Sequence, residues 1–318
     1  MTDVLTDLLD TMRLGTLVYG RLELGAPWGF QLPDRGAAHI VVVGRGSARL
    51  EVDGRRAPLN LSAGDVVFVP RGGSHILRDS KGSALFAFGE SECRSFRDTR
   101  SVKLSRGGLQ TVLVVCAFQF RAAHSTFSMQ RLARSIHVPA THAARPPWFA
   151  STVEQFVAES SSQEPGAMVV MSRLADVLLV QTIRFYIAGN ECAAHGLRAL
   201  SDRSIARALA LIHERPADGW TVEKLAQSAG LSRSGFAERF RALVGDPPLE
   251  YLARWRMTKA AELLRDSDLA MIDVAERVGY RSEASFHRAF KRLEGVTPGA
   301  FRRRFTRASS PASGPRTA

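Results

Sequence analysis

Cysteine is scarce in this sequence. Only three occur in 318 residues, Cys93, Cys116 and Cys192, and no two of them form a CxxC pair. An odd number of cysteines without a close pair is typical of a reducing compartment and argues against a disulfide framework. We therefore expect a cytoplasmic protein.

Long uninterrupted hydrophobic runs are also missing. The most apolar stretch, residues 169–187, is broken by Arg173, Asp176 and Arg184, which are too many charges for a bilayer span. The first 15 residues contain three aspartates and lack the basic start and apolar stretch of a secretory signal. We expect no membrane partner.

Acidic residues are outnumbered, and the imbalance is concentrated in one part of the chain. Residues 198–318 contain 22 Lys and Arg against 14 Asp and Glu, so they carry +8 of the formal net charge of +12. A basic region of this kind favours a polyanion partner, with nucleic acid ahead of a membrane surface. A chain of this length should also form about two domains, each with its own core.

The pattern of apolar residues divides the chain into regions. Residues 15–120 read as short strands with Gly and Pro between them, which predicts a barrel or sandwich. Helical periodicity begins near residue 128 and returns after residue 200. We predict an α+β multidomain protein with a sensor barrel at 1–125, a helical connector or dimerisation region at 126–188, a linker at 189–199, an all-α domain at 200–307 and a disordered tail at 308–318.

One helix of the connector region has an apolar face. Leu174, Val177, Leu178 and Phe185 share one side of a helix expected to end near Gly189. This face packs either in the core of the chain or against a second copy in a homodimer, and the sequence leaves both open.

The C-terminal region contains an internal repeat of about 50 residues. Leu225, Ala226, Gly230 and Leu231 recur 49 positions later as Val274, Ala275, Gly279 and Tyr280, and Phe240, Gly245, Pro248 and Tyr251 recur 50 positions later as Phe290, Gly295, Pro298 and Phe301. Each copy reads as a helix, a turn that contains glycine, and a second helix. This is the pattern of a helix-turn-helix, so the sequence predicts two of them in tandem.

The second helix of each copy should bury one face and present the other to solvent. We expect Ser232 and Ser282 to cap these helices, and the Phe pairs at positions 236 and 240 and at 286 and 290 to be buried. In a helix-turn-helix the outward face enters the major groove of DNA. The candidate DNA-binding residues are Arg233, Ser234, Ala237, Glu238 and Arg241 in the first copy, and Ser282, Glu283, Ala284, His287, Arg288 and Lys291 in the second.

Residues 200–305 resemble the DNA-binding domain of AraC-type transcription regulators. The resemblance is carried by PPLEYLARWRMTKAAELL, VGYRSEASFHRAFKR and GVTPGAFRRRF, which fall where that family has its most specific segments. It implies sequence-specific binding to double-stranded promoter DNA, RNA polymerase as a partner, and a place in the bacterial cytoplasm at the nucleoid. Carried over to matching positions, the base-reading candidates are Ser234, Ala237 and Glu238, then Glu283, Ala284, His287 and Arg288.

Glu238 departs from this resemblance, because many family members have arginine there. A carboxylate repels phosphates, although it can also accept a hydrogen bond from N4 of cytosine. The first helix therefore specifies bases less strongly than the second, or specifies different ones.

The N-terminal region resembles the cupin-type sensor domain that is joined to AraC-type regulators. The segments LGAPWGFQLP, AHIVVVGRG, SAGDVVFVPRGGSH and TVLVVCAFQF occur in the expected order, and Gly64, Pro70, Gly72 and His75 match the second cupin motif. Metal-binding cupins have two histidines one residue apart and a glutamate in the first motif. This chain has His39, but Val41 stands at the second position and the glutamate is missing, so no catalysis is expected.

Three interpretations of the barrel remain open. His39, His75 and Cys116 could bind a metal ion such as zinc. Alternatively, the barrel holds a small organic effector, with Trp28 or Phe30 among the lining residues, or His75 simply satisfies backbone groups beside its turn. Because the set of metal ligands is incomplete, we assign no cofactor.

Cys93 is the candidate for a redox signal. Arg94 and Arg97 flank it, and a reactive thiol needs an accessible, electropositive setting. Cys116 lies in an apolar run and is expected to be buried, and an inert thiol is the simpler interpretation of both.

We predict a transcription regulator that senses a small-molecule or redox signal in its barrel and binds DNA with its C-terminal domain. Two other classes remain for comparison. A cupin metalloenzyme fused to a DNA-binding module would need a complete set of ligands, and an architectural DNA binder would bind all duplexes nearly equally, whereas a regulator prefers its own site by roughly 10³ or more.

Overall fold

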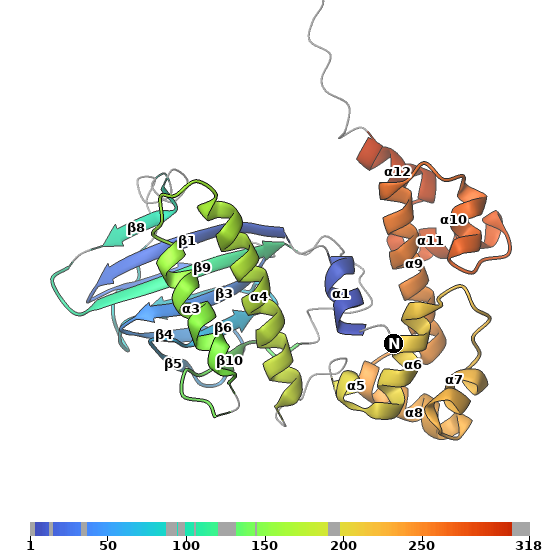
Figure 1. The fold of residues 1–318 in the computed structure, drawn as a ribbon, viewed down its shortest axis with the longest axis horizontal. Coiled ribbons are helices and arrows are strands. Elements are labelled where there is room, and N and C mark those ends of the chain that lie inside the picture. The colour runs from blue at the N-terminus through green and yellow to red at the C-terminus, as the bar shows by residue number, and fades with distance from the viewer. Residues whose placement is uncertain are drawn as a thin grey trace, which may run out of the picture. The chain divides into compact units, whose positions relative to one another are not determined.

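The computed structural model describes residues 4–12, 15–32, 37–86, 94, 99–104, 106–119, 132–143, 145–189 and 198–306. The chain forms two compact units, and we describe each by itself (Figure 1). The barrel unit comprises Leu14–Arg121 and Met129–Ala194. The helical unit comprises Met1–Arg13, Ala122–Ser128 and His195–Ala318.

Two sheets face each other in the barrel unit. The larger has the order β10-β6-β3-β9-β1-β8 and the smaller the order β2-β7-β4-β5. The strands are β1 (Gly15–Gly25), β2 (Gly29–Leu32), β3 (Ala38–Arg45), β4 (Ser47–Val52), β5 (Leu59–Ser62), β6 (Val66–Val69), β7 (His75–Arg78), β8 (Ser101–Leu104), β9 (Gln110–Gln119) and β10 (Ile136–Val138). Neighbouring strands are antiparallel except for β1 and β8.

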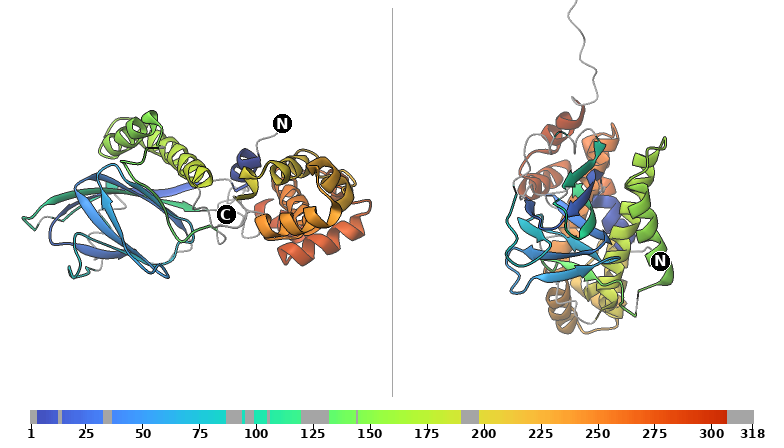
Figure 2. Two further views of the ribbon diagram at one scale, coloured as in Figure 1. Left: turned by 90° about the horizontal axis from the view of Figure 1, so that it is seen from below. Right: turned by 90° about the vertical axis from the view of Figure 1, so that its left-hand side faces the viewer.

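The core of the barrel unit lies between the two sheets. Alternate residues of each strand point into it, such as Val41 and Val43 of β3, which meet Leu50 of β4 and Leu77 of β7 in one apolar cluster. The other face of the larger sheet is covered by α3 (Pro147–Glu159) and α4 (Ala167–Ala188) (Figures 1 and 2). The central strands of this sheet are therefore buried on both faces.

The helix α4 buries only part of the apolar face expected from the sequence. Met171, Ala175 and Leu178 are buried, whereas Val177 is 41% exposed. The sequence predicted one apolar face that includes Val177 and Leu178 and packs either in the core or against a second copy. These two residues are adjacent in sequence and about 100° apart on a helix, and the structure buries Leu178 and exposes Val177.

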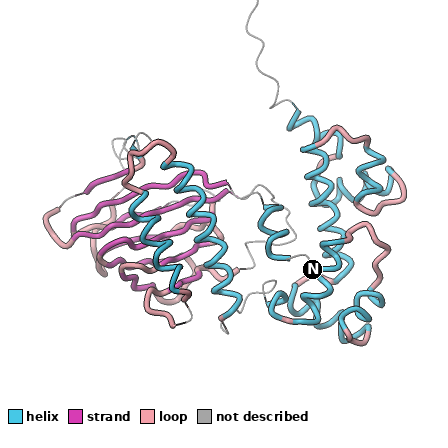
Figure 3. Tube along the Cα trace, in the orientation of Figure 1, coloured by secondary structure: helices cyan, strands magenta, loops and turns pink. Residues whose placement is uncertain are grey.

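All regular structure described in the helical unit is helical (Figure 3). Its helices are α1 (Val4–Met12), α5 (Arg198–Ser201), α6 (Arg203–Glu214), α7 (Val222–Ala229), α8 (Arg233–Val244), α9 (Pro248–Asp266), α10 (Met271–Arg277), α11 (Glu283–Glu294) and α12 (Pro298–Thr306). The long helix α9 connects the two halves of the unit (Figure 1). The α+β fold with a strand-rich first domain and an all-α second one is confirmed.

The helix α1 belongs to the helical unit, whereas the barrel predicted from the sequence included residues 1–125. It packs on α6 and α9 with Val4 and Leu8 buried. Asp7 Oδ2 lies 3.4 Å from Nδ1 of His213, whose ring stacks on Trp255 and whose Nε2 is 2.8 Å from the hydroxyl of Tyr251. His213 is thus a buried polar group that joins α1 to the centre of this unit.

Candidate DNA interface

The two helix-turn-helix motifs have the same turn geometry. Gly230 and Gly279 adopt φ values of 70° and 84°, in the left-handed region that favours glycine. The residue after each glycine closes the turn, since the amide of Leu231 donates to Ala226 (3.0 Å) and that of Tyr280 to the carbonyl of Ala275 (2.8 Å). The repeat found in the sequence is therefore a repeat of local structure.

The start of each second helix is also the same in both copies. Ser232 Oγ accepts the amide hydrogen of Gly235 at 3.2 Å, and Ser282 Oγ accepts that of Ser285 at 3.3 Å. The caps expected from the sequence are confirmed. The aromatic pairs at 236 and 240 and at 286 and 290 are completely buried, so each helix is fixed against its unit and turns one face outward.

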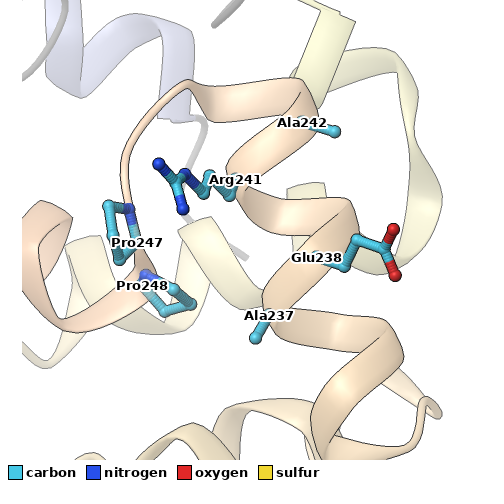
Figure 4. Close-up of a pocket in the computed structure, with 6 residues that line it drawn as sticks. All are labelled: Ala237, Glu238, Arg241, Ala242, Pro247 and Pro248. Carbon is cyan, nitrogen blue, oxygen red and sulfur yellow. The ribbon is translucent and has the colours of Figure 1, made fainter.

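The outward face of α8 is formed by Ser234, Ala237, Glu238 and Arg241, which stand three or four residues apart. Ser234, Glu238 and Arg241 are exposed, and Ala237 is half-buried. A hollow of about 670 Å³ lies along this face, lined by Ala237, Glu238, Arg241, Ala242, Pro247 and Pro248. Figure 4 shows Arg241 lying toward the two prolines, whereas the Glu238 carboxylate lies away from them.

Two other arginines of α8 form ion pairs. Arg233, a DNA-binding candidate from the sequence, has its Nε 2.6 Å from Glu223 Oε1 on α7. Arg239 donates from Nε and Nη2 to Asp202 Oδ2 at 2.8 and 2.6 Å. Sequence spacing did not reveal these pairs, because Glu223 lies on α7 and Asp202 is the N-cap residue of α6.

The outward face of α11 has a different character. Glu283, Ala284, Arg288 and Lys291 are exposed, and His287 is half-buried with its Nε2 3.5 Å from Glu283 Oε1. No ion pair is found for Arg288 among the described residues. Arg288 therefore offers donors at the position of α11 that corresponds, 50 residues later, to the carboxylate of Glu238 in α8.

A loop of the first half is held against the second motif. Arg256 of α9 donates from Nε to the carbonyl of Pro216 (2.6 Å) and from Nη2 to that of Asp218 (2.9 Å). Ala217 between them lies so close to Gly279 that a Cβ there would be 2.8 Å from its Cα and its oxygen. This contact fixes the two motifs relative to each other within the helical unit.

His39 and His75 lie together inside the barrel unit. Their ring centroids are 5.1 Å apart, and both side chains are buried. Nδ1 of His75 lies 3.0 Å from the carbonyl of Gly73 and donates to it, and Nε2 has no hydrogen-bond partner among the described residues. Burial lowers the pKa of His75, against the effect of Gly73, so the neutral ring is favoured.

Cys116 is separated from these histidines, which corrects the grouping of the three as one site. In the pairing of β3 with β9, His39 stands opposite Ala117 and Ile40 opposite Cys116. Since paired residues share a face and neighbours alternate, Cys116 points to the opposite side of the sheet from His39. It is buried there, and burial raises the pKa of its thiol.

The remaining barrel candidates lie in different settings. Trp28 and Phe30 belong to the core between the sheets, with ring centroids 5.8 Å apart, and Trp28 Nε1 is buried without a partner in the described part of the chain. Within that same part, no three His, Cys, Asp or Glu side chains gather in a way that could hold a metal ion. Cys93 and the expected tail at 308–318 lie outside the described residues.

Known proteins match both units of the chain. The family model described as "Cupin" matches residues 3–188, and the one described as "Helix-turn-helix domain" matches residues 225–304. A "Putative AraC-like transcription regulator" of Streptomyces lividans is 33% identical over 310 residues, which are 95% of this chain and 98% of that protein. The chain belongs to the AraC-like transcription regulators.

Other relatives of this AraC-like regulator agree in their description. The HTH-type transcriptional regulator MtrA of Neisseria gonorrhoeae is 30% identical over 95% of this chain and 98% of its own. Among solved structures, the DNA-binding domain of AdpA in complex with a target DNA is 35% identical, with a TM-score of 0.33, and covers 34% of this chain and 96% of that one. No described helix of the AraC-like chain is long and apolar enough to cross a membrane.

Proposed function

We propose that this regulator binds promoter DNA by placing α8 and α11 in two segments of the major groove. The observation that carries the proposal is the pair of matching helix-turn-helix motifs. In each motif the second helix begins at a capping serine, buries an aromatic pair on one face and exposes the opposite face. Two such helices joined by α9 suit groove segments on one side of the duplex, about 34 Å apart. A protein that acts at a promoter would have RNA polymerase as a partner and would lie at the nucleoid in the bacterial cytoplasm.

Arg288 is the residue we propose as the main base contact. It is exposed on the outward face of α11, and the five donors of its guanidinium match O6 and N7 of guanine. Lys291 and the helix N-terminus at Ser282 suit phosphates, as does Arg241 on α8. Arg233 is less available, because Glu223 must release it first.

The test compares Arg288→Ala with Arg207→Ala on a selected operator and on random duplex DNA at one salt concentration. Arg207 serves as the control, because it is exposed on α6, a helix that forms no part of the outward faces of α8 and α11. We expect Arg288→Ala to lose about 1–3 kcal/mol of binding free energy on the operator and much less on random DNA. Equal losses on both duplexes would show that Arg288 contacts only phosphate, and an equal loss in Arg207→Ala would show that charge alone matters.

We further propose that the barrel unit receives the signal and performs no catalysis. Support comes from two buried polar atoms that have no hydrogen-bond partner among the described residues, Nε2 of His75 and Nε1 of Trp28. They suit a small organic molecule that both donates and accepts hydrogen bonds. The donation from His75 Nδ1 to a carbonyl would also suit a metal ligand, but two histidines make an incomplete donor set for iron or zinc. The organic effector is therefore the better supported of the two, and Cys93 remains a prediction for a redox signal.

The exposed side of α4 supports a homodimer. Met168, Val169, Val170 and Val177 are between 41% and 63% exposed, although they are apolar. A patch of this kind suits a second copy of the same helix, related by a two-fold axis. Light scattering should give the mass of a dimer for the native chain and of a monomer for Val170→Glu; a native monomer would end the proposal.

A further inference from the structure

Glu238 is the one charged acceptor on the outward face of α8. The face consists of Ser234, Ala237, Glu238 and Arg241, and the Glu238 side chain is exposed. No ion pair of Glu238 is found among the described residues, whereas Glu223 and Asp202 nearby are taken by Arg233 and Arg239. Its carboxylate is free to meet a ligand.

Two arginines of the first motif form ion pairs with carboxylates other than that of Glu238. Arg233 is drawn to α7 and Arg239 to Asp202, so neither stands beside the Glu238 carboxylate as its partner. Arg241 lies one turn closer to the C-terminus of α8, toward Pro247 and Pro248 (Figure 4). Since recognition helices contact bases mainly with their N-terminal residues, Arg241 is placed for a phosphate and Glu238 for a base edge.

The major-groove edges of the bases decide which one a carboxylate selects. Guanine presents two acceptors, N7 and O6, and thymine presents the O4 acceptor and a methyl group, so a carboxylate is repelled by both. Adenine presents a donor beside an acceptor. Cytosine presents only the N4 donor, which is the partner that a carboxylate requires.

We infer that the first helix-turn-helix selects a cytosine through Glu238, whereas the second selects guanine through donors on α11. The inference rests on the proposed function, because it names the base that the same interface recognises. The small side chain of Ala237 leaves room for the neighbouring base pair and suits the methyl group of a thymine. A carboxylate also repels the phosphates of any unmatched duplex, so it reduces binding to random DNA as well as choosing a base.

The experiment selects duplexes from a randomised pool with the full-length protein and with Glu238→Gln, Glu238→Arg and Glu214→Gln. Glu214 is an exposed glutamate at the end of α6 and serves as the matched control. In the native protein one position of the first segment should be cytosine, and its replacement by guanine should weaken binding roughly 5- to 150-fold. Arginine at position 238 should change the preferred base to guanine and glutamine should change it to adenine, with the second segment unchanged.

The outcomes separate the inference from the function on which it rests. A native protein that selects a clear second segment, but whose Glu238 variants select the same first segment as Glu214→Gln, overturns the inference and leaves DNA recognition intact. A native protein that selects no sequence overturns both. Because Glu238 is exposed, its variants should fold, and their far-ultraviolet circular dichroism should match that of the native chain.

Discussion

The two turn glycines offer a matched pair of substitutions with different expected costs. Both adopt a left-handed φ, so Gly230→Ala and Gly279→Ala impose the same backbone strain. A Cβ at position 230 meets nothing within 4 Å, whereas one at position 279 lies 2.8 Å from Ala217 Cα and oxygen and from Nη2 of Arg256. The pair therefore separates backbone strain from steric contact.

The magnitudes follow from these surroundings. A non-glycine residue in the left-handed region costs about 1–2 kcal/mol, partly offset by a gain of about 0.4–1 kcal/mol because alanine restricts the unfolded chain. Gly230→Ala should thus lower the free energy of unfolding by roughly 0–1.6 kcal/mol. Gly279→Ala adds an overpacking cost of about 1–3 kcal/mol, because Arg256 holds the 216–218 loop in place by its two hydrogen bonds.

The helical unit can be followed separately from the barrel unit. The chain has four tryptophans, of which Trp220 and Trp255 lie in the helical unit. Labelling with 5-fluorotryptophan and recording ¹⁹F spectra through a urea titration gives an unfolding curve for each position. We expect Gly279→Ala to lower the free energy of unfolding recorded at Trp255 by about 1–4.6 kcal/mol, with no change at Trp28. Equal losses in the two glycine variants would refute the claim that the 216–218 loop rests against the second turn.

Two further predictions concern buried histidines. Burial lowers the pKa of His213 below its ordinary value of 6.5, against the opposing effect of Asp7. Below pH 6.5 the unfolded chain therefore binds a proton at this histidine more strongly than the native chain does. The free energy of unfolding should therefore fall as the pH drops below 6.5, and His213→Gln should reduce this dependence; a urea midpoint independent of pH between 7.5 and 5 would contradict it. Purified protein should contain no stoichiometric metal, since His39 and His75 form an incomplete ligand set; one metal per chain that is lost in His75→Ala would reverse our preference for an organic effector.

The helical unit could be predicted from the sequence because its signals are local. Capping serines, turn glycines and buried aromatic pairs occur at fixed distances along the chain, and each acts within a few residues of itself. Because the chain contains two copies of the repeat, each of these local signals occurs twice. The ion pair of Arg233 with Glu223 was not predictable in the same way, because it depends on how α7 and α8 cross.

The orientation of residues in the barrel could not be read from the sequence. Strands β3 and β9 are buried on both faces, by the core on one side and by α3 and α4 on the other, so their apolar residues do not alternate with polar ones. Without alternation the sequence cannot say that His39 and Cys116 point in opposite directions. The sequence also could not predict that α1 packs in the helical unit, because a short apolar face such as that of Val4 and Leu8 can pack on many apolar surfaces.

The most direct test of the account is a hydroxyl-radical footprint of the full-length protein on a duplex obtained by selection, with random DNA as competitor. Two helix-turn-helix motifs joined by α9 predict two protected segments on one side of the duplex, centred about one helical turn apart, and a preference for that duplex of roughly 10³ or more over random DNA. A single protected segment, or equal affinity for both duplexes, would contradict recognition by α8 and α11 together.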